Sequence, residues 1–432
     1  MPVFENSMAT IMAGSSIKNL LPHYRCLEHR FRIWSLPFSL LVFQPFSHVK
    51  VYDMTTIKAC RVCGREFFTA PLLRYANMPK AAQNFPAASV LALDKGVDLE
   101  VCQCFGCGLV QLSNEPVPYY REVIRASAVS EVIKADKMRQ FADFIRKYSL
   151  QGKKIIELGC GRGEFLSLLS LLDVKAYGLE YSEKAVAECL KNGLDVSQGY
   201  PDGETCLLAK GPFDAFLLLM FLEHMPQPNV ALRVIYDNLT DNAVGLIEVP
   251  NLDMVLRKNL FSEFIGDHLL YFTKETLQTT LRLNGFDVID YQELRDDYVI
   301  SVVVKKRTRI DISHFHDYRI KIKDEIDAYL NRFAAKRVAV WGAGHQALAA
   351  ISLTGIADRI RYLVDSAPFK QGKYTPATHL PIVAPEALLS DPVDAIIIMA
   401  ASYSDEVAAI IRQRFGFDMT VAILRDFGLE TV

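Results

Sequence analysis

Short apolar runs and amphipathic segments alternate through the middle of the chain. The apolar run 153–158 predicts a buried strand, and the helical spacing of apolar residues over 131–148 predicts a helix before it. Further strands are predicted over 175–179, 213–220, 244–249, 287–293 and 298–304, and further helices over 182–191, 229–239 and 277–284. This alternation of strand and helix predicts an α/β fold built on a parallel sheet.

A glycine-rich turn follows the first of these strands. Gly159, Gly161 and Gly163 occupy every second position, and a helix is predicted directly afterwards, over 165–172. Glycine permits a positive φ and lets a ligand approach the backbone closely. A strand, a glycine turn and a helix in this order are typical of the first unit of a nucleotide-binding α/β domain.

The acids around this turn favour S-adenosylmethionine over a dinucleotide. A dinucleotide fingerprint needs a third glycine where Glu164 stands, and it places a pyrophosphate on helix amides. S-adenosylmethionine has no phosphate but offers an amine, a carboxylate and a ribose. Glu157 before the turn suits such groups, and Glu180 at the end of the next strand is predicted to hold the ribose hydroxyls. In this segment the chain resembles the class I methyltransferases.

A second part of the cofactor site is predicted after the apolar run 213–220. Phe221, Leu222 and Glu223 follow this run at the carboxyl end of a central strand, where parallel sheets bind ligands. Their backbone is predicted to lie along the methionine part of the cofactor. The next residue, His224, is interpreted as a wall of the site, with catalysis as the alternative.

The cysteines indicate a metal centre. Four of the nine form two Cys-x-x-Cys-Gly knuckles, and they are Cys60, Cys63, Cys104 and Cys107. Four thiolates satisfy a tetrahedral zinc ion and leave no open position for catalysis, so the predicted zinc is structural. Cys102 is an alternative to Cys104 as a ligand. The segment 73–86 between the knuckles has no clean period and is predicted to be a loop that forms a lid or wall.

The order of these motifs resembles a known family. Knuckle pair, glycine turn and a further α/β domain are similar, from residue 57 to the end, to three-part C-methyltransferases acting on nucleotide-linked keto-sugars. The resemblance implies seven strands with a reversed last hairpin and a nucleotide-sugar as methyl acceptor.

The predicted chemistry lies in the stretch 265–273. Its Asp267, His268 and Tyr271 place an acid, a base and a hydroxyl together. Methylation of a carbon beside a ketone needs a base, and a neutral imidazole suits that task. The resemblance assigns the base to His268. Asp267 is predicted to orient or tune it, and Tyr271 to donate to the developing oxyanion.

The acceptor side departs from the family. Ile265, Gly266 and Asp267 replace a tyrosine, a histidine and a glutamate. Ile124 stands where the family has a tyrosine, with Tyr119 or Tyr120 as substitutes, and Arg295-Asp296-Asp297 replaces a His-Gly-Gly run.

The C-terminal part carries a second glycine turn. Gly342-Ala343-Gly344 follows a predicted strand, and Asp365 ends the next one. This pattern alone is compatible with NAD binding, which defines an oxidoreductase alternative. The resemblance instead assigns the segment to a domain that helps to hold the nucleotide-sugar, with Lys370 and Lys373 as candidate cations.

Composition narrows the function further. The net charge of −2 argues against a nucleic-acid surface, and no apolar run reaches the roughly 18 residues of a membrane span. We therefore expect a cytoplasmic enzyme. The expected parts are a disordered extension (1–53), a zinc module (54–115), a methyltransferase domain (116–306), a linker helix (307–335) and a C-terminal α/β domain (336–432).

Together these features predict a class I methyltransferase Rossmann-like domain between a zinc-knuckle module and a small parallel α/β domain. The expected reaction is C-methylation of a nucleotide-activated keto-sugar through an enolate. Alternatives are O- or N-methylation of another small metabolite, and a non-catalytic protein that binds S-adenosylmethionine.

Overall fold

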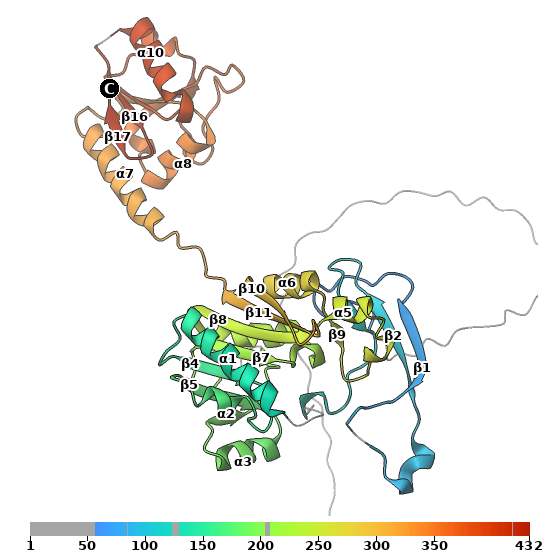
Figure 1. Ribbon diagram of the computed structural model, residues 1–432. Coiled ribbons are helices and arrows are strands. Elements are labelled where there is room, and N and C mark those ends of the chain that lie inside the picture. Colours follow the sequence, from blue (N-terminus) through green and yellow to red (C-terminus); the bar gives the residue numbers. More distant parts are fainter. Residues whose placement is uncertain (1–56, 84, 123–128, 204–207, 417) are drawn as a thin grey trace, which may run out of the picture. The chain divides into compact units, whose positions relative to one another are not determined.

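The computed structural model describes residues 57–432 except 84, 123–128, 204–207 and 417. The predicted extension 1–53 and Ile124 lie outside the described residues. In the part described, the strands form sheets of four, seven and six strands (Figure 1).

The seven-stranded sheet forms the central α/β domain. Its strands are β4 (Lys154–Leu158), β5 (Lys175–Glu180), β6 (Val196–Gln198), β7 (Phe213–Leu219), β8 (Leu239–Pro250), β10 (Phe286–Leu294) and β11 (Val299–Lys306). Their spatial order is β10-β11-β8-β7-β4-β5-β6, and only β11 runs opposite to the others, pairing antiparallel with β10 and with β8. This order confirms the predicted seven strands with a reversed last hairpin. The order reverses at β4, so a ligand crevice is expected at the carboxyl ends of β4 and β7.

Buried side chains cover both faces of this sheet. Adjacent residues of β4, Ile155 and Ile156, belong to separate core clusters, as expected when successive side chains of a strand point to opposite faces. The helices around the sheet are α1 (Glu131–Lys147), α2 (Leu166–Leu169), α3 (Glu183–Lys191), α4 (Pro228–Asp237) and α6 (Lys274–Leu283).

One predicted helix is too long. The helix predicted over 165–172 is a single turn, α2, because the chain must return within a few residues to begin β5 at Lys175. Ser182 occupies the N-cap position of α3, but its side chain does not cap the helix; its backbone amide donates instead to Glu180 Oε1 at 2.9 Å.

The cysteine module contains the four-stranded sheet, in the order β1-β2-β3-β9. Its strands are β1 (Leu73–Met78), β2 (Val97–Gln103), β3 (Val110–Leu112) and β9 (Leu270–Tyr271). The loop predicted over 73–86 therefore begins as a strand. β1 lies at the sheet edge and none of its residues is buried, which explains why its sequence lacks a clear alternation.

The strand β9 comes from the stretch 265–273 and pairs with β3 of the cysteine module. Cys60, Cys104 and Leu109 also belong to the same core cluster as Leu222 and Leu269. The cysteine module and the domain of the seven-stranded sheet are thus packed together through the stretch 265–273. The short helix α5 (Leu252–Arg257) follows β8 and packs in the cluster that contains β1–β3 residues.

The C-terminal part forms a second α/β unit, as predicted. Its sheet has the order β14-β13-β12-β15-β16-β17, with only β17 antiparallel. The strands are β12 (Val338–Trp341), β13 (Ile360–Val364), β14 (Ile382–Val383), β15 (Ala395–Ile398), β16 (Thr420–Leu424) and β17 (Leu429–Thr431). The helices are α7 (His314–Leu330), α8 (His345–Thr354), α9 (Ala387–Ser390) and α10 (Ser404–Phe415). The linker helix was predicted over 307–335, whereas α7 begins at His314 and ends five residues before the predicted end.

Candidate active site and metal centre

The glycine turn after β4 needs its glycines for two physical reasons. Gly159, Gly161 and Gly163 all have a positive φ, at 68°, 57° and 84°. A Cβ on Gly159 would lie 2.9 Å from the ring of Phe221, and a Cβ on Gly163 would lie 2.4 Å from Leu194 Cδ1. The turn is therefore both left-handed and tightly packed, and the amides of Gly159 and Gly163 donate to the carbonyls of Leu179 and Cys160.

The two predicted acids flank this turn. Glu180, at the end of β5, accepts hydrogen bonds from the backbone amides of Gly161 (Oε2, 2.9 Å) and Ser182 (Oε1, 2.9 Å). Burial raises the pKa of Glu180. Glu157 is buried in β4. Glu180 thus fixes the glycine turn against the next strand, at the position predicted for the ribose.

Phe221, Leu222 and Glu223 directly follow β7. Met220 has a φ of 54°, which turns the chain sharply out of the strand, and Leu222–His224 form one turn of 3-10 helix. The ring of Phe221 faces Gly159 and stacks edge-to-face on Tyr200 at 5.7 Å. The second predicted cofactor segment therefore lies against the first.

An arginine that the sequence did not single out closes this side of the site. The guanidinium of Arg121 lies over the rings of Tyr120, Tyr181 and Tyr200, at 5.0, 5.5 and 5.7 Å from their centroids. It also pairs with Asp202 at 2.5 Å. Arg121 thereby connects the segment before α1 to the residues that follow β5 and β6. No local pattern indicated this contact, because its partners are 60 to 81 residues further along the chain.

In the stretch 265–273, the contacts of Asp267 differ from the expected pairing with His268. Its carboxylate accepts from the Tyr119 hydroxyl (Oδ1, 2.7 Å) and from the Ala82 amide (Oδ2, 2.9 Å). The acid therefore holds Tyr119, one of the two tyrosines suggested as substitutes, and the segment that follows β1. It contacts the neighbouring histidine His224 only through its backbone carbonyl, which accepts from Nδ1 at 2.7 Å.

Tyr271 is buried in β9. Its hydroxyl accepts from the Ile265 amide at 3.0 Å and donates to the Ile265 carbonyl at 3.2 Å. Its ring packs on Phe264, with centroids 4.8 Å apart. In this conformation the Tyr271 hydroxyl bonds to another residue of the same stretch, 265–273. Its role as a donor to the oxyanion stays a prediction.

His268 lies beside His224 at the carboxyl edge of the sheet. The two rings meet edge-to-face, with centroids 4.7 Å apart. Burial and the neighbouring His224 lower the pKa of His268 to about 3, so its imidazole is neutral at physiological pH. Burial and the charge of Glu248 raise the pKa of the adjoining Glu223 to about 8. His224 was interpreted as a wall of the site, with catalysis as the alternative, and its place directly after Phe221–Glu223 was the signal for its position beside His268.

The four knuckle cysteines converge as predicted, with all sulfurs within 4.8 Å of one another. Cys60 Sγ and Cys107 Sγ are 3.6 Å apart, and Cys63 Sγ and Cys104 Sγ are 3.3 Å apart. In a tetrahedral zinc site with Zn–S bonds of about 2.3 Å, the sulfurs are separated by roughly 3.8 Å. Cys102 is buried but is not part of this group.

The surroundings of the four sulfurs also suit a metal-bound thiolate. Cys60 Sγ accepts from the side-chain amide of Gln111 at 3.2 Å, and Cys104 Sγ accepts from the backbone amide of Gly106 at 3.2 Å. The hydrogen bond between the Cys60 and Cys107 thiols lowers the pKa of Cys60 to about 4 and raises that of Cys107. These donors stabilise negative charge on sulfur, which is the form that binds zinc.

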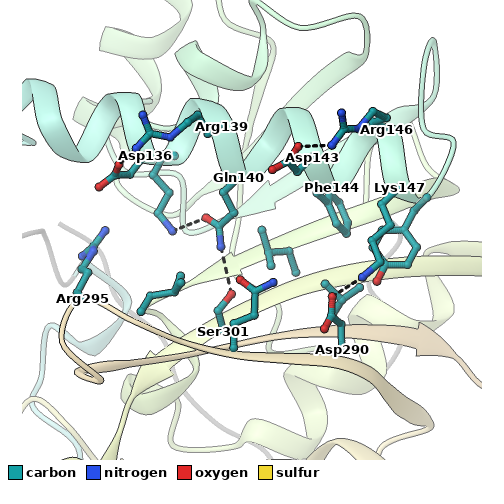
Figure 2. Close-up of a pocket in the computed structure, with 16 residues that line it drawn as sticks. Asp136, Arg139, Gln140, Asp143, Phe144, Arg146, Lys147, Asp290, Arg295 and Ser301 are labelled. Carbon is teal, nitrogen blue, oxygen red and sulfur yellow. Dashed lines mark hydrogen bonds and ion pairs between the residues drawn. The ribbon is translucent and has the colours of Figure 1, made fainter.

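A cavity of about 680 Å³ lies elsewhere, between α1 and the strands β10 and β11 (Figure 2). Its charged side chains are largely paired: Arg139 with Asp136, Arg146 with Asp143, and Lys147 with Asp290. Gln140 bridges α1 to Ser301 across the cavity at 3.1 Å. Its lining, taken over the described chain, includes none of the predicted cofactor, catalytic or metal residues.

The second glycine turn has its acid engaged. Asp365 accepts from the amides of Ala343 (2.8 Å) and Ala367 (2.9 Å), and from Lys370 Nζ (2.8 Å). Lys370 is thus paired within its own loop, whereas Lys373 is exposed.

Comparison with known proteins decides the family. The model of a methyltransferase domain matches residues 132–291, and that of a C-methyltransferase C-terminal domain matches residues 306–417. C-methyltransferase NovU of Streptomyces niveus is 23% identical over 390 residues, which cover 81% of this chain and 91% of NovU. The chain is an S-adenosylmethionine-dependent methyltransferase, and over most of its length it is similar to a C-methyltransferase. Its methyl donor is therefore S-adenosylmethionine, and the oxidoreductase alternative is set aside.

Other relatives match this methyltransferase over shorter stretches. A ubiquinone biosynthesis O-methyltransferase of Pseudomonas putida (strain W619) is 32% identical over 96 residues, 21% of this chain and 41% of that protein. An S-adenosylmethionine-dependent methyltransferase from Clostridium acetobutylicum ATCC 824 aligns over 40% of this chain and 92% of its own, with 12% identity and a TM-score of 0.34. Among the residues described, no helix combines the length and apolarity that crossing a membrane requires.

Proposed function

We propose that this methyltransferase methylates a carbon beside the ketone of a nucleotide-activated sugar, by way of an enolate. The observation that carries the proposal is the position of His268. A neutral imidazole lies at the carboxyl edge of the sheet, in ring contact with His224, immediately beside the segment Phe221–Glu223. A base in that place lies close to the predicted methyl donor.

The residues around the glycine turn suit the donor. Gly159 and Gly161 offer close backbone approach, Glu180 lies at the end of the neighbouring strand, and Phe221 forms an apolar wall. When bound, S-adenosylmethionine supplies an electrophilic methyl group on a sulfonium. We assign these residues, with Glu157, Gly163, Leu222 and Glu223, to its binding.

His268 takes the carbon proton in the proposed reaction. A pKa of about 3 makes the free imidazole a weak base, because a buried imidazolium has lost its hydration. The negative charge that develops on the enolate beside it compensates for that loss. Tyr119 and Asp267, which bond to each other at 2.7 Å, contribute a polar group on the acceptor side where the family tyrosine is absent.

The nucleotide part of the acceptor is assigned to the C-terminal unit. The match to a C-methyltransferase C-terminal domain over residues 306–417 supports this assignment. The unit also has a glycine turn at the end of β12 and an exposed cation, Lys373.

The acceptor is tested with labelled S-adenosylmethionine and a panel of nucleotide-sugars that have or lack a ketone. Methyl transfer to a carbon of the keto-sugars alone is expected, with exchange of the neighbouring C–H proton in deuterated water. Transfer to a hydroxyl or an amine, or to sugars without a ketone, contradicts the proposal and favours the O- or N-methylation alternative.

We also infer a structural zinc ion at Cys60, Cys63, Cys104 and Cys107. Metal analysis is expected to give about one tightly held zinc per chain. Cys104→Ser removes a ligand and should release the zinc and lower the melting temperature, because the cysteines share a core with the methyltransferase sheet. Cys102→Ser is the matched control and should retain it. If Cys102→Ser loses the zinc and Cys104→Ser retains it, then Cys102, and not Cys104, is the zinc ligand.

A further inference from the structure

A second cluster of metal-ligating side chains lies next to the glycine turn. Glu223, His224 and His268 each bring one ligand atom, and these atoms lie within 4.8 Å of one another. We propose that they form a binding site for a divalent transition-metal ion, distinct from the four cysteines. The site goes beyond the proposed methyl transfer and does not depend on it.

The carboxylate of Glu223 is the strongest sign of a missing cation. Its side chain is 1% exposed, and neither carboxylate oxygen has a hydrogen-bond partner among the described residues. A buried carboxyl group whose oxygens have no hydrogen-bond partner is unfavourable, and more so when it is ionised. A metal ion between this carboxylate and the imidazoles removes that penalty, whereas the present neighbours do not.

His224 is already oriented for such an ion. Its Nδ1 donates to the backbone carbonyl of Asp267 at 2.7 Å, so Nδ1 carries the proton and Nε2 carries the lone pair. Nε2 lies 3.8 Å from Glu223 Oε1. Histidine ligands in metal sites commonly donate their other ring nitrogen to a carbonyl in this way, which fixes the tautomer.

The third ligand is held close by the backbone. The Leu269 amide donates to the Glu223 carbonyl at 2.8 Å, which keeps the residue after His268 against the 3-10 turn of Glu223. Ligand bonds of about 2.0–2.2 Å place donor atoms roughly 3–3.5 Å apart. His268 is partly exposed, so its side chain has room to move. A movement of about an ångström brings its donor atom to such a distance from the other two ligands.

The donor set selects the class of ion. Two imidazoles and one carboxylate suit Zn²⁺, Co²⁺ or Fe²⁺, whereas Mg²⁺ and Ca²⁺ favour oxygen ligands. The ion takes the lone pair that His268 needs to accept a proton. If the proposed reaction holds, metal occupancy and proton abstraction therefore exclude one another, and the ion is a reversible inhibitor.

The site is tested on the full chain, with zinc retained at the cysteines, by titrating Co²⁺ in the absence of any acceptor. Visible absorption and calorimetry should report one Co²⁺ per chain. Its spectrum should lack the intense sulfur-to-cobalt absorption that marks exchange at the cysteines. Glu223→Gln and His224→Ala should each weaken binding by about tenfold or more. Glu131→Gln, the same change at an exposed site on α1, is the control.

Two results would overturn the site: no Co²⁺ bound beyond the cysteines, or equal binding in the control, Glu223→Gln and His224→Ala. Circular dichroism establishes that each variant is folded, and Glu223→Gln preserves the side-chain volume. Because binding is measured without acceptor, failure of the proposed methyl transfer leaves this outcome unaffected. Conversely, absence of the site leaves the role of His268 as a base intact.

Discussion

Turnover is expected to fall about 100-fold or more in His268→Ala, once an acceptor is in hand. The substitution removes the neutral imidazole beside Phe221–Glu223 that is assigned to take the carbon proton. Calorimetry should show S-adenosylmethionine binding close to that of the unchanged protein. The loss should therefore appear in kcat, and exchange of the acceptor's C–H proton with deuterated water should fall in parallel.

His316→Ala provides the control, because His316 is exposed on α7 and belongs to neither site. Its kcat and its exchange rate should be unchanged. Unaltered turnover in His268→Ala would reject the base assignment. Proton exchange that persists while methyl transfer is lost would instead place His268 at the methyl-transfer step.

Gly159→Ala should abolish measurable binding of S-adenosylmethionine and lower the free energy of unfolding. A left-handed φ of 68° costs an alanine about 1 kcal/mol or more. The added Cβ would also lie 2.9 Å from the ring of Phe221. The ring or the turn must shift, and both belong to the predicted cofactor site. Calorimetry measures the binding, and urea denaturation measures the stability.

Gly152→Ala separates strain from the loss of the site. Gly152 also has a φ of 68°, and in the part of the chain described nothing lies within 4 Å of a Cβ built there. This variant should lose a similar amount of stability from its backbone and keep its affinity for the cofactor. Equal affinities in the two variants would show that the turn after β4 does not hold the methyl donor.

Local patterns identified the elements that depend on a few consecutive residues. The glycine turn could be predicted because glycine is the residue that tolerates its φ values and its packing. The two Cys-x-x-Cys-Gly knuckles could be predicted because two intervening residues let paired thiols face one ion. The parallel strands were legible as continuous apolar runs such as 213–220, since both faces of a central strand are buried.

Elements with weaker local signals were misjudged. β1 is an edge strand without a buried residue, so its sequence lacks the alternation that marks a strand. α2 has only four residues. The short connection to β5, and not the helix propensity of the residues, decides where α2 ends. Ser182 has the residue type and position of a cap, but Glu180 takes its amide.

The sequence by itself determined the class of fold, the glycine turn after β4 and the grouping of the four sulfurs, since each follows from backbone conformation or spacing within a few residues. Only the tertiary structure decided what surrounds His268. The pairing of β9 with β3, the bond between Tyr119 and Asp267, and the meeting of His224 with His268 join residues 44 to 161 positions apart. Such contacts depend on the path of the whole chain around the sheet, which no local pattern encodes.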